Sequence, residues 1–173
     1  MTFFYRGPSG RIPARSADLM RLATSVALIA YPLGCLIQLI FPDTSPEAGL
    51  SWGEGGGFAL IILALFAFVI IAPSQLQRIT GEEAKALDEF EINLRRRAYT
   101  FAYQVFAAIV LVGILYTAIA VDTLDSDRFT LWVPTSYDHW NAVFWGAVLY
   151  AFVLPTAYLA WTAPAPIEDE VEA

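Results

Sequence analysis

Four long apolar segments run along the chain, separated by polar stretches. They cover residues 22–41, 55–72, 98–121 and 140–161, and none of them contains Asp, Glu, Lys, Arg or His. About 20 apolar residues in helical form cross a hydrocarbon core roughly 30 Å thick. Lipid offers no hydrogen-bond partner to the backbone, and these segments lack the alternation of barrel strands. The pattern therefore predicts an all-α integral membrane protein: one domain, residues 1–173, built as a four-helix bundle of transmembrane helices.

Two of these spans admit another interpretation. The second span has only 18 residues, so by itself it also fits a re-entrant or interfacial segment. Its continuous apolar run over 58–72 and the charge pattern described below favour a full crossing. The first span resembles the apolar core of a signal peptide, but it is longer, and no small-residue cleavage site follows it. We therefore expect it to be retained as the first helix.

The basic residues predict the orientation. Nine of the ten lie before the first span or between the second and third spans, and only Arg128 lies between the third and fourth. The positive-inside rule then places both termini, including the acidic tail 163–173, in the cytoplasm. Composition agrees with the membrane class, because 57 % of residues are apolar and 16 % are charged, against about 45–50 % and 25 % in soluble domains. The dominance of Arg over Lys favours a bacterial inner membrane.

The cytoplasmic loop 80–97 carries a helix signal. Thr80 and Glu83 have the spacing of a capping box, which predicts one helix from Glu82 through the third span to Val121. Glu91 and Arg95 have the favourable i,i+4 order on that helix. One face of the extension then carries Ala84, Leu87, Glu91, Leu94 and Ala98, with Phe90 beside it.

This extension has two candidate uses. Arg95, Arg96 and Arg97 stand next to the third span, where arginines attract anionic lipid headgroups. The alternative is a docking surface for a partner, made by the arginines together with Leu87, Phe90 and Leu94. We favour the headgroup anchor, although the acids nearby weaken a purely lipid-binding role.

The polar and small residues inside the spans point to helix packing. Gln38 and Gln104 are candidates for hydrogen bonds between helices, but they lie at different depths, so we do not pair them. Pro32 and Pro155 should kink the first and fourth helices, and Cys35 is expected to behave as a small hydrophobic residue. Pairs of small residues four apart allow close helix approach: Ala23 and Ala27, Ala98 and Ala102, Gly113 and Thr117, Ala142 and Gly146.

His139 is the only histidine and the one candidate ligand for a haem, a pigment or a metal. It follows Asp138 and precedes Trp140 at the predicted outer interface. A lone histidine forms no multi-residue metal site. A polar residue that caps the fourth helix is therefore the favoured interpretation, and no cofactor is predicted.

Other motifs fail on spacing. Asp122, Asp125 and Asp127 lack the Gly and Glu of a calcium loop, and the glycines of 53–57 lack the Lys of a phosphate loop, so we interpret the glycines as a flexible entry to the second span. No serine stands in a nucleophile motif, and no basic stripe with interleaved aromatic residues suggests nucleic acid.

The sequence therefore favours a non-catalytic inner-membrane protein. The leading hypothesis is an accessory or assembly subunit of a larger membrane complex, for example a respiratory or photosynthetic one. Its expected partners are the lipid bilayer and other membrane-protein subunits. The alternatives are a small oligomeric transporter or channel, and a haem- or pigment-binding protein that uses His139.

Overall fold

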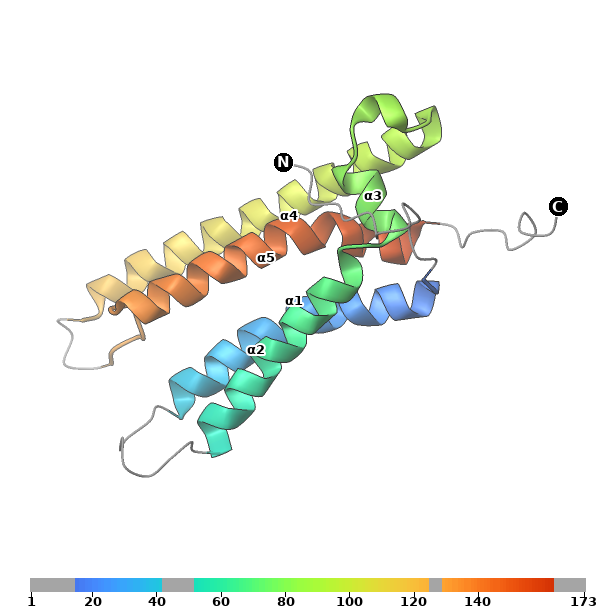
Figure 1. Ribbon diagram of the computed structural model, residues 1–173. Coiled ribbons are helices and arrows are strands. Elements are labelled where there is room, and N and C mark those ends of the chain that lie inside the picture. The colour runs from blue at the N-terminus through green and yellow to red at the C-terminus, as the bar shows by residue number, and fades with distance from the viewer. Residues whose placement is uncertain (1–14, 42–51, 125–128, 164–173) are drawn as a thin grey trace.

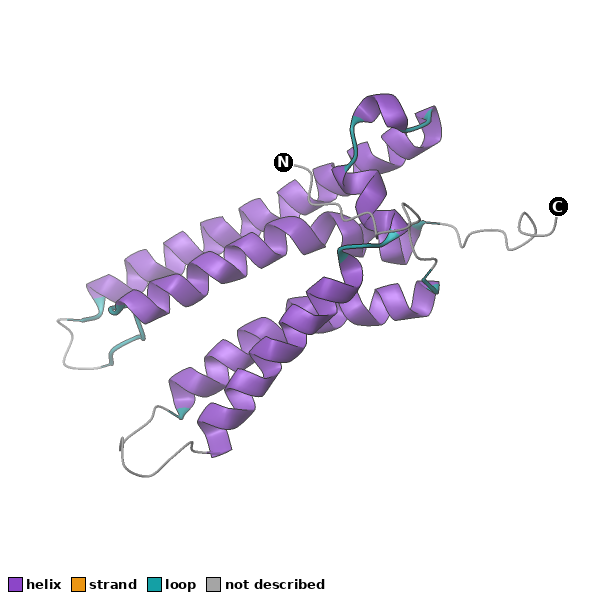
Figure 2. Ribbon diagram, viewed as in Figure 1, coloured by secondary structure: helices purple, strands orange, loops and turns teal. Residues whose placement is uncertain are grey.

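The computed structural model describes residues 15–41, 52–124 and 129–163, and over these residues the fold is all helical, as predicted. The five α-helices are α1 (Ala17–Ile40), α2 (Trp52–Ile71), α3 (Gln75–Gly81), α4 (Glu89–Asp122) and α5 (Tyr137–Thr162) (Figure 2). A 3-10 helix, η1 (Ala84–Ala86), lies between α3 and α4. The described residues contain no strand.

Three helices, α1, α4 and α5, are long and apolar enough to cross a membrane. α2 and α3 give a fourth candidate span if they are counted together as one broken element. The helix axis turns by 81° between Gly55–Ile71 and Gln75–Gly81. Pro73 lies at this break, where its missing N–H and its ring prevent a continuous helix. The chain thus has three or four candidate spans.

The long helices form two antiparallel pairs (Figure 1). α1 packs along α2, and α4 packs along α5. The pairs meet through α1 and α5 and through α3, which contacts both α4 and α5. Figure 1 shows that they converge at the end where α1 begins and α5 ends, and diverge towards the opposite end. We call the convergent end the α3 end.

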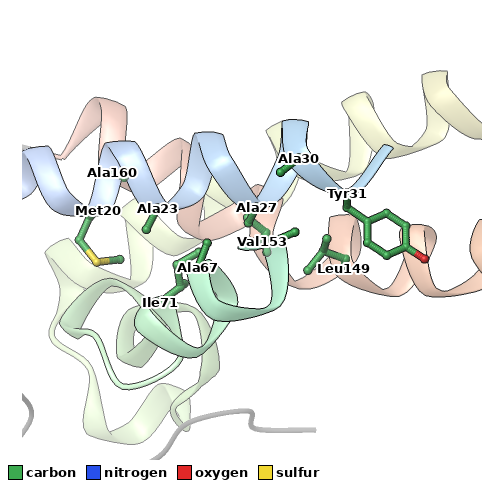
Figure 3. Close-up of a cluster of buried hydrophobic side chains, with 11 residues drawn as sticks. Met20, Ala23, Ala27, Ala30, Tyr31, Ala67, Ile71, Leu149, Val153 and Ala160 are labelled. Atoms are coloured by element: carbon green, nitrogen blue, oxygen red, sulfur yellow. The ribbon is translucent and has the colours of Figure 1, made fainter. Parts of the chain in front are cut away.

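The hydrophobic core lies between α1, α2 and α5 and consists largely of small side chains (Figure 3). The predicted small pair Ala23 and Ala27 is buried in it, at 4 % and 0 % exposure. Small residues let helix backbones approach closely, which is how helices associate in lipid. The cluster is made by Met20, Ala23, Ala27, Ala30, Tyr31, Ala64, Ala67, Ile71, Leu149, Val153 and Ala160.

α1 and α2 approach each other closely at two glycines. A Cβ on Gly34 would lie 2.6 Å from the Gly57 carbonyl oxygen, and a Cβ on Gly57 would lie 2.8 Å from the Gly34 carbonyl oxygen. Neither position has room for a side chain. The expectation of a flexible glycine-rich entry was therefore wrong: residues 53–57 form the first turns of α2, and Gly57 is a packing residue.

The prediction of one helix from Glu82 to Val121 was also wrong. Thr80 lies near the end of α3, where its hydroxyl donates to the Gln77 carbonyl at 3.0 Å. α4 begins only at Glu89, under a complete capping box formed by Asp88 and Glu91. Thr80–Glu83 and Asp88–Glu91 both have capping-box spacing. A helix that starts at Thr80 would have Gly81 in its first turn, where glycine is a poor helix former, whereas the first turn of α4 contains no glycine or proline.

Candidate functional site

The α3 end gathers most of the described polar contacts between helices. Ser74 caps α3 by accepting from the Gln77 N–H at 3.1 Å. The Thr156 hydroxyl of α5 donates to Gln77 Oε1 at 2.6 Å, and both side chains are buried. Buried polar groups need such partners, because an unpaired group away from water is costly. The Thr156–Gln77 bond fixes α3 against α5.

A second set of contacts fixes the α3–α4 connection. The Arg78 guanidinium pairs with Glu82 at 3.0 Å and also with Glu91. The Tyr99 hydroxyl donates to the Thr80 carbonyl at 2.9 Å. The predicted Glu91–Arg95 pair is therefore replaced, since Glu91 turns to Arg78. The loop folds back onto α4 and does not extend it as a straight helix.

The three consecutive arginines divide into two kinds. Arg95 turns inwards: it donates to the Glu82 carbonyl at 2.6 Å, and its guanidinium lies 5.7 Å from the centre of the Tyr99 ring. Arg96 and Arg97 are exposed. Among the described residues, neither of these two side chains forms a hydrogen bond or an ion pair. The sequence treats the three as equivalent, but the structure leaves two of them open to a ligand.

The predicted apolar docking residues also separate. Leu87 is buried in the loop, at 7 % exposure, and Leu94 is half-buried. Phe90 is 62 % exposed on the first turn of α4. The predicted common face with Ala84 does not exist, because residues 84–88 precede α4. Of the three apolar candidates, Phe90 is the one that presents a large free surface.

Arg21 links the start of α1 to the end of α5. Its Nε donates to the Ala160 carbonyl near the end of α5 at 3.1 Å, and its guanidinium lies 5.7 Å from the centre of the Trp161 ring. The last carbonyls of a helix lack intrahelical partners, and a cation there also complements the helix dipole. Sequence reasoning counted Arg21 only as a topology signal. α5 ends at Thr162, so the Ala160 carbonyl lies in the last turn, but no sequence pattern pairs it with Arg21.

Two tyrosines link α1 and α5. Tyr150 donates to the Leu28 carbonyl at 2.6 Å, and Tyr31 donates to the Ala142 carbonyl at 2.9 Å. Leu28 lies four residues before Pro32, which has no N–H to donate to it. Tyr150 supplies the bond that the proline cannot make. The proline was noted in the sequence as a source of a kink, but its tyrosine partner was missed.

His139 lies at the opposite end of the molecule from α3, in the first turn of α5. The Ser136 hydroxyl accepts from the His139 N–H at 3.2 Å, and His139 Nδ1 accepts from the Ser136 N–H at 3.4 Å. This is a capping box, so Nδ1 is used in helix capping. The ring also packs edge-on against Trp132, with centres 5.2 Å apart.

The other polar candidates within the spans lie apart. Gln38 packs beside Gly57 at the α1–α2 crossing, whereas Gln104 is exposed on α4. Gly113 has open space around it, although the Thr117 hydroxyl returns to the Gly113 carbonyl at 2.8 Å. Cys35 is a free, half-buried thiol on α1.

The acidic outer segment is described only in part. Asp122 is the last residue of α4, while Asp125 and Asp127 lie outside the described residues. Within the described ranges, no group of three or more His, Cys, Asp or Glu side chains is placed to hold a metal ion.

Comparison with protein-family models, with curated proteins and with solved structures finds no match to this chain.

Proposed function

We propose that the chain is a four-span protein of the bacterial inner membrane, with both termini in the cytoplasm, that acts as a non-catalytic accessory or assembly subunit of a larger membrane complex. Support for the orientation comes from charge. The basic residues of the described chain gather at the α3 end, on the start of α1, on α3, on η1 and on the start of α4. Positive charge on one side of the spans is the usual mark of the cytoplasmic face.

The observation that carries the subunit role is a pair of exposed apolar side chains, on different faces of the first turns of α4. Phe90 is 62 % exposed and Ile92 is 40 % exposed. Both precede Arg95–Arg97, so they lie on the water side of the residues that mark the membrane boundary. Lipid tails would cover apolar side chains within the span but not these two. A partner subunit packed around the start of α4 would remove both side chains from water, which is favourable.

The rest of α4 agrees with this role. Only 6 % of its most apolar 18-residue window is buried within the chain, and α4 packs mainly on α5 and on α3. Such a helix offers its free faces both to lipid and to the helices of neighbouring subunits.

Gentle extraction into polymer nanodiscs followed by native electrophoresis tests the proposal. The wild-type chain should migrate together with other membrane proteins, in an assembly larger than a disc that holds one 19.1 kDa chain. Replacing both Phe90 and Ile92 by Ser should release it from that assembly, whereas Asn93→Ser, at an exposed neighbour, should not. A wild-type chain that migrates alone under these conditions would exclude the subunit role.

A further inference from the structure

One exposed stripe on α4 combines charge, a hydroxyl and an aromatic ring. Arg96, Thr100 and Tyr103 are spaced four and three residues apart, so they share one face of the helix. All three are exposed, and Tyr103 is 74 % exposed. Arg97 is exposed on the adjoining face. The stripe therefore presents two guanidinium groups, with a phenol ring about 10 Å further along the helix.

The stripe continues as apolar surface. Val110, Leu111 and Ile114 follow on the same side of α4, and they are 40 %, 66 % and 62 % exposed. Basic residues come first, then an interfacial tyrosine, then exposed aliphatic side chains. A phospholipid presents its phosphate, its glycerol region and its acyl chains in the same order.

The acids near the stripe do not neutralise it. Glu82 and Glu91 are held by Arg78 on the side of α4 that faces α3. Glu89 shares the face of Arg96 but lies seven residues away, about 10 Å along the axis, which is about one Debye length at physiological salt. Arg95 is already engaged by the loop, so the free charge is that of Arg96 and Arg97.

We propose that Arg96 and Arg97 bind the headgroup phosphate of an anionic phospholipid of the inner leaflet, with the Tyr103 hydroxyl donating to its glycerol region and its acyl chains lying along α4. Guanidinium groups bind phosphate oxygens through paired, charge-assisted hydrogen bonds. The inference rests on α4 crossing the membrane, and it is independent of any partner subunit.

The test measures lipid retention by the full-length protein in nanodiscs of phosphatidylcholine that contain a minor fraction of phosphatidylglycerol. Arg96→Gln with Arg97→Gln should weaken phosphatidylglycerol retention about 10- to 30-fold, from about 1 kcal/mol for each arginine. Lys85→Gln is the matched control: it removes one exposed charge at the same end of the molecule and should leave retention unchanged. Arg96→Lys with Arg97→Lys keeps both charges and should restore most of the retention.

Three results would overturn the proposal. The first is equal retention by the wild type and the double Gln variant. The second is the same loss in Lys85→Gln, which would indicate a general charge effect. The third is complete displacement of the lipid by millimolar inorganic phosphate, which would make this a free-phosphate site. A double Gln variant that fails to fold is recognised by its loss of helical signal in circular dichroism. In that case, the double Lys variant is compared with Tyr103→Phe. Tyr103→Phe should weaken phosphatidylglycerol retention, whereas the double Lys variant should keep most of it.

Discussion

The hydrogen bond from Tyr150 to the Leu28 carbonyl should stabilise the junction of the two helix pairs only because Pro32 leaves that carbonyl free. Tyr150→Phe removes the donor and leaves the ring, so it tests the 2.6 Å bond with little change in packing. A lost intramolecular hydrogen bond costs about 0.5–1.5 kcal/mol, and side-chain bonds between membrane helices average about 0.6 kcal/mol with a maximum near 1.7. We expect a loss of about 1 kcal/mol, since the carbonyl has no backbone donor to replace the tyrosine.

Pro32→Ala provides the second arm of a double-mutant cycle. Alanine restores an N–H at position 32, and this N–H can bond the Leu28 carbonyl within α1. In the Pro32→Ala background, Tyr150→Phe should therefore cost less than about 0.5 kcal/mol, below the usual worth of one hydrogen bond. The assay is reversible unfolding in mixed detergent micelles, followed by circular dichroism.

Tyr116→Phe is the matched control for this cycle. Its hydroxyl donates to the Trp132 carbonyl at 2.9 Å, and neither residue belongs to α1. The cost of Tyr116→Phe should be the same in the wild-type and the Pro32→Ala backgrounds. The reasoning fails if Tyr150→Phe costs equally in both backgrounds, because the proline would then have no part in creating the site.

Two further substitution pairs compare neighbouring residues. Gly57→Ala should destabilise the α1–α2 pair by about 1–3 kcal/mol, the usual cost of overpacking. Gly56→Ala should be neutral or stabilising, because no atom lies within 4 Å of its Cβ position. Thermal unfolding distinguishes the two variants, and equal effects would contradict the close crossing at Gly57. Asp88→Ala should lower the free energy of unfolding by about 1 kcal/mol and speed amide exchange over residues 89–92. Thr80→Ala should leave that exchange unchanged. The reverse pattern would support the helix start at Glu82 that the sequence predicts.

The sequence predicted the parts of the fold that depend on local chemistry. Apolar length located the long helices to within a few residues, and small-residue spacing identified Ala23 and Ala27 as a packing pair. The start of α4 was misplaced because two capping boxes compete within a short stretch, Thr80–Glu83 and Asp88–Glu91. Their outcome depends on contacts further along the chain, including the pairing of Glu91 with Arg78.

The candidate site was predicted by type but not by residue. The run Arg95–Arg97 was recognised as basic, yet no periodicity rule shows that Arg95 bonds the loop while its neighbours remain exposed. Tyr150 could not be paired with Leu28 for a similar reason. Pro32 indicates which carbonyl is free, but the donor comes from 122 residues away, and only the packing of α1 on α5 brings it close.

Labelling of single cysteines with a membrane-impermeant thiol reagent determines whether α2 crosses the membrane and returns the chain to the side where α1 begins. Cys35→Ala provides the cysteine-free background, and the labelling positions are Asp18→Cys, Lys85→Cys and Thr130→Cys. Positions 18 and 85 should react only in inverted membrane vesicles, and position 130 should react in intact spheroplasts. Reaction of position 85 from the same face as position 130 would show that α2 does not cross, and would contradict the four-span arrangement.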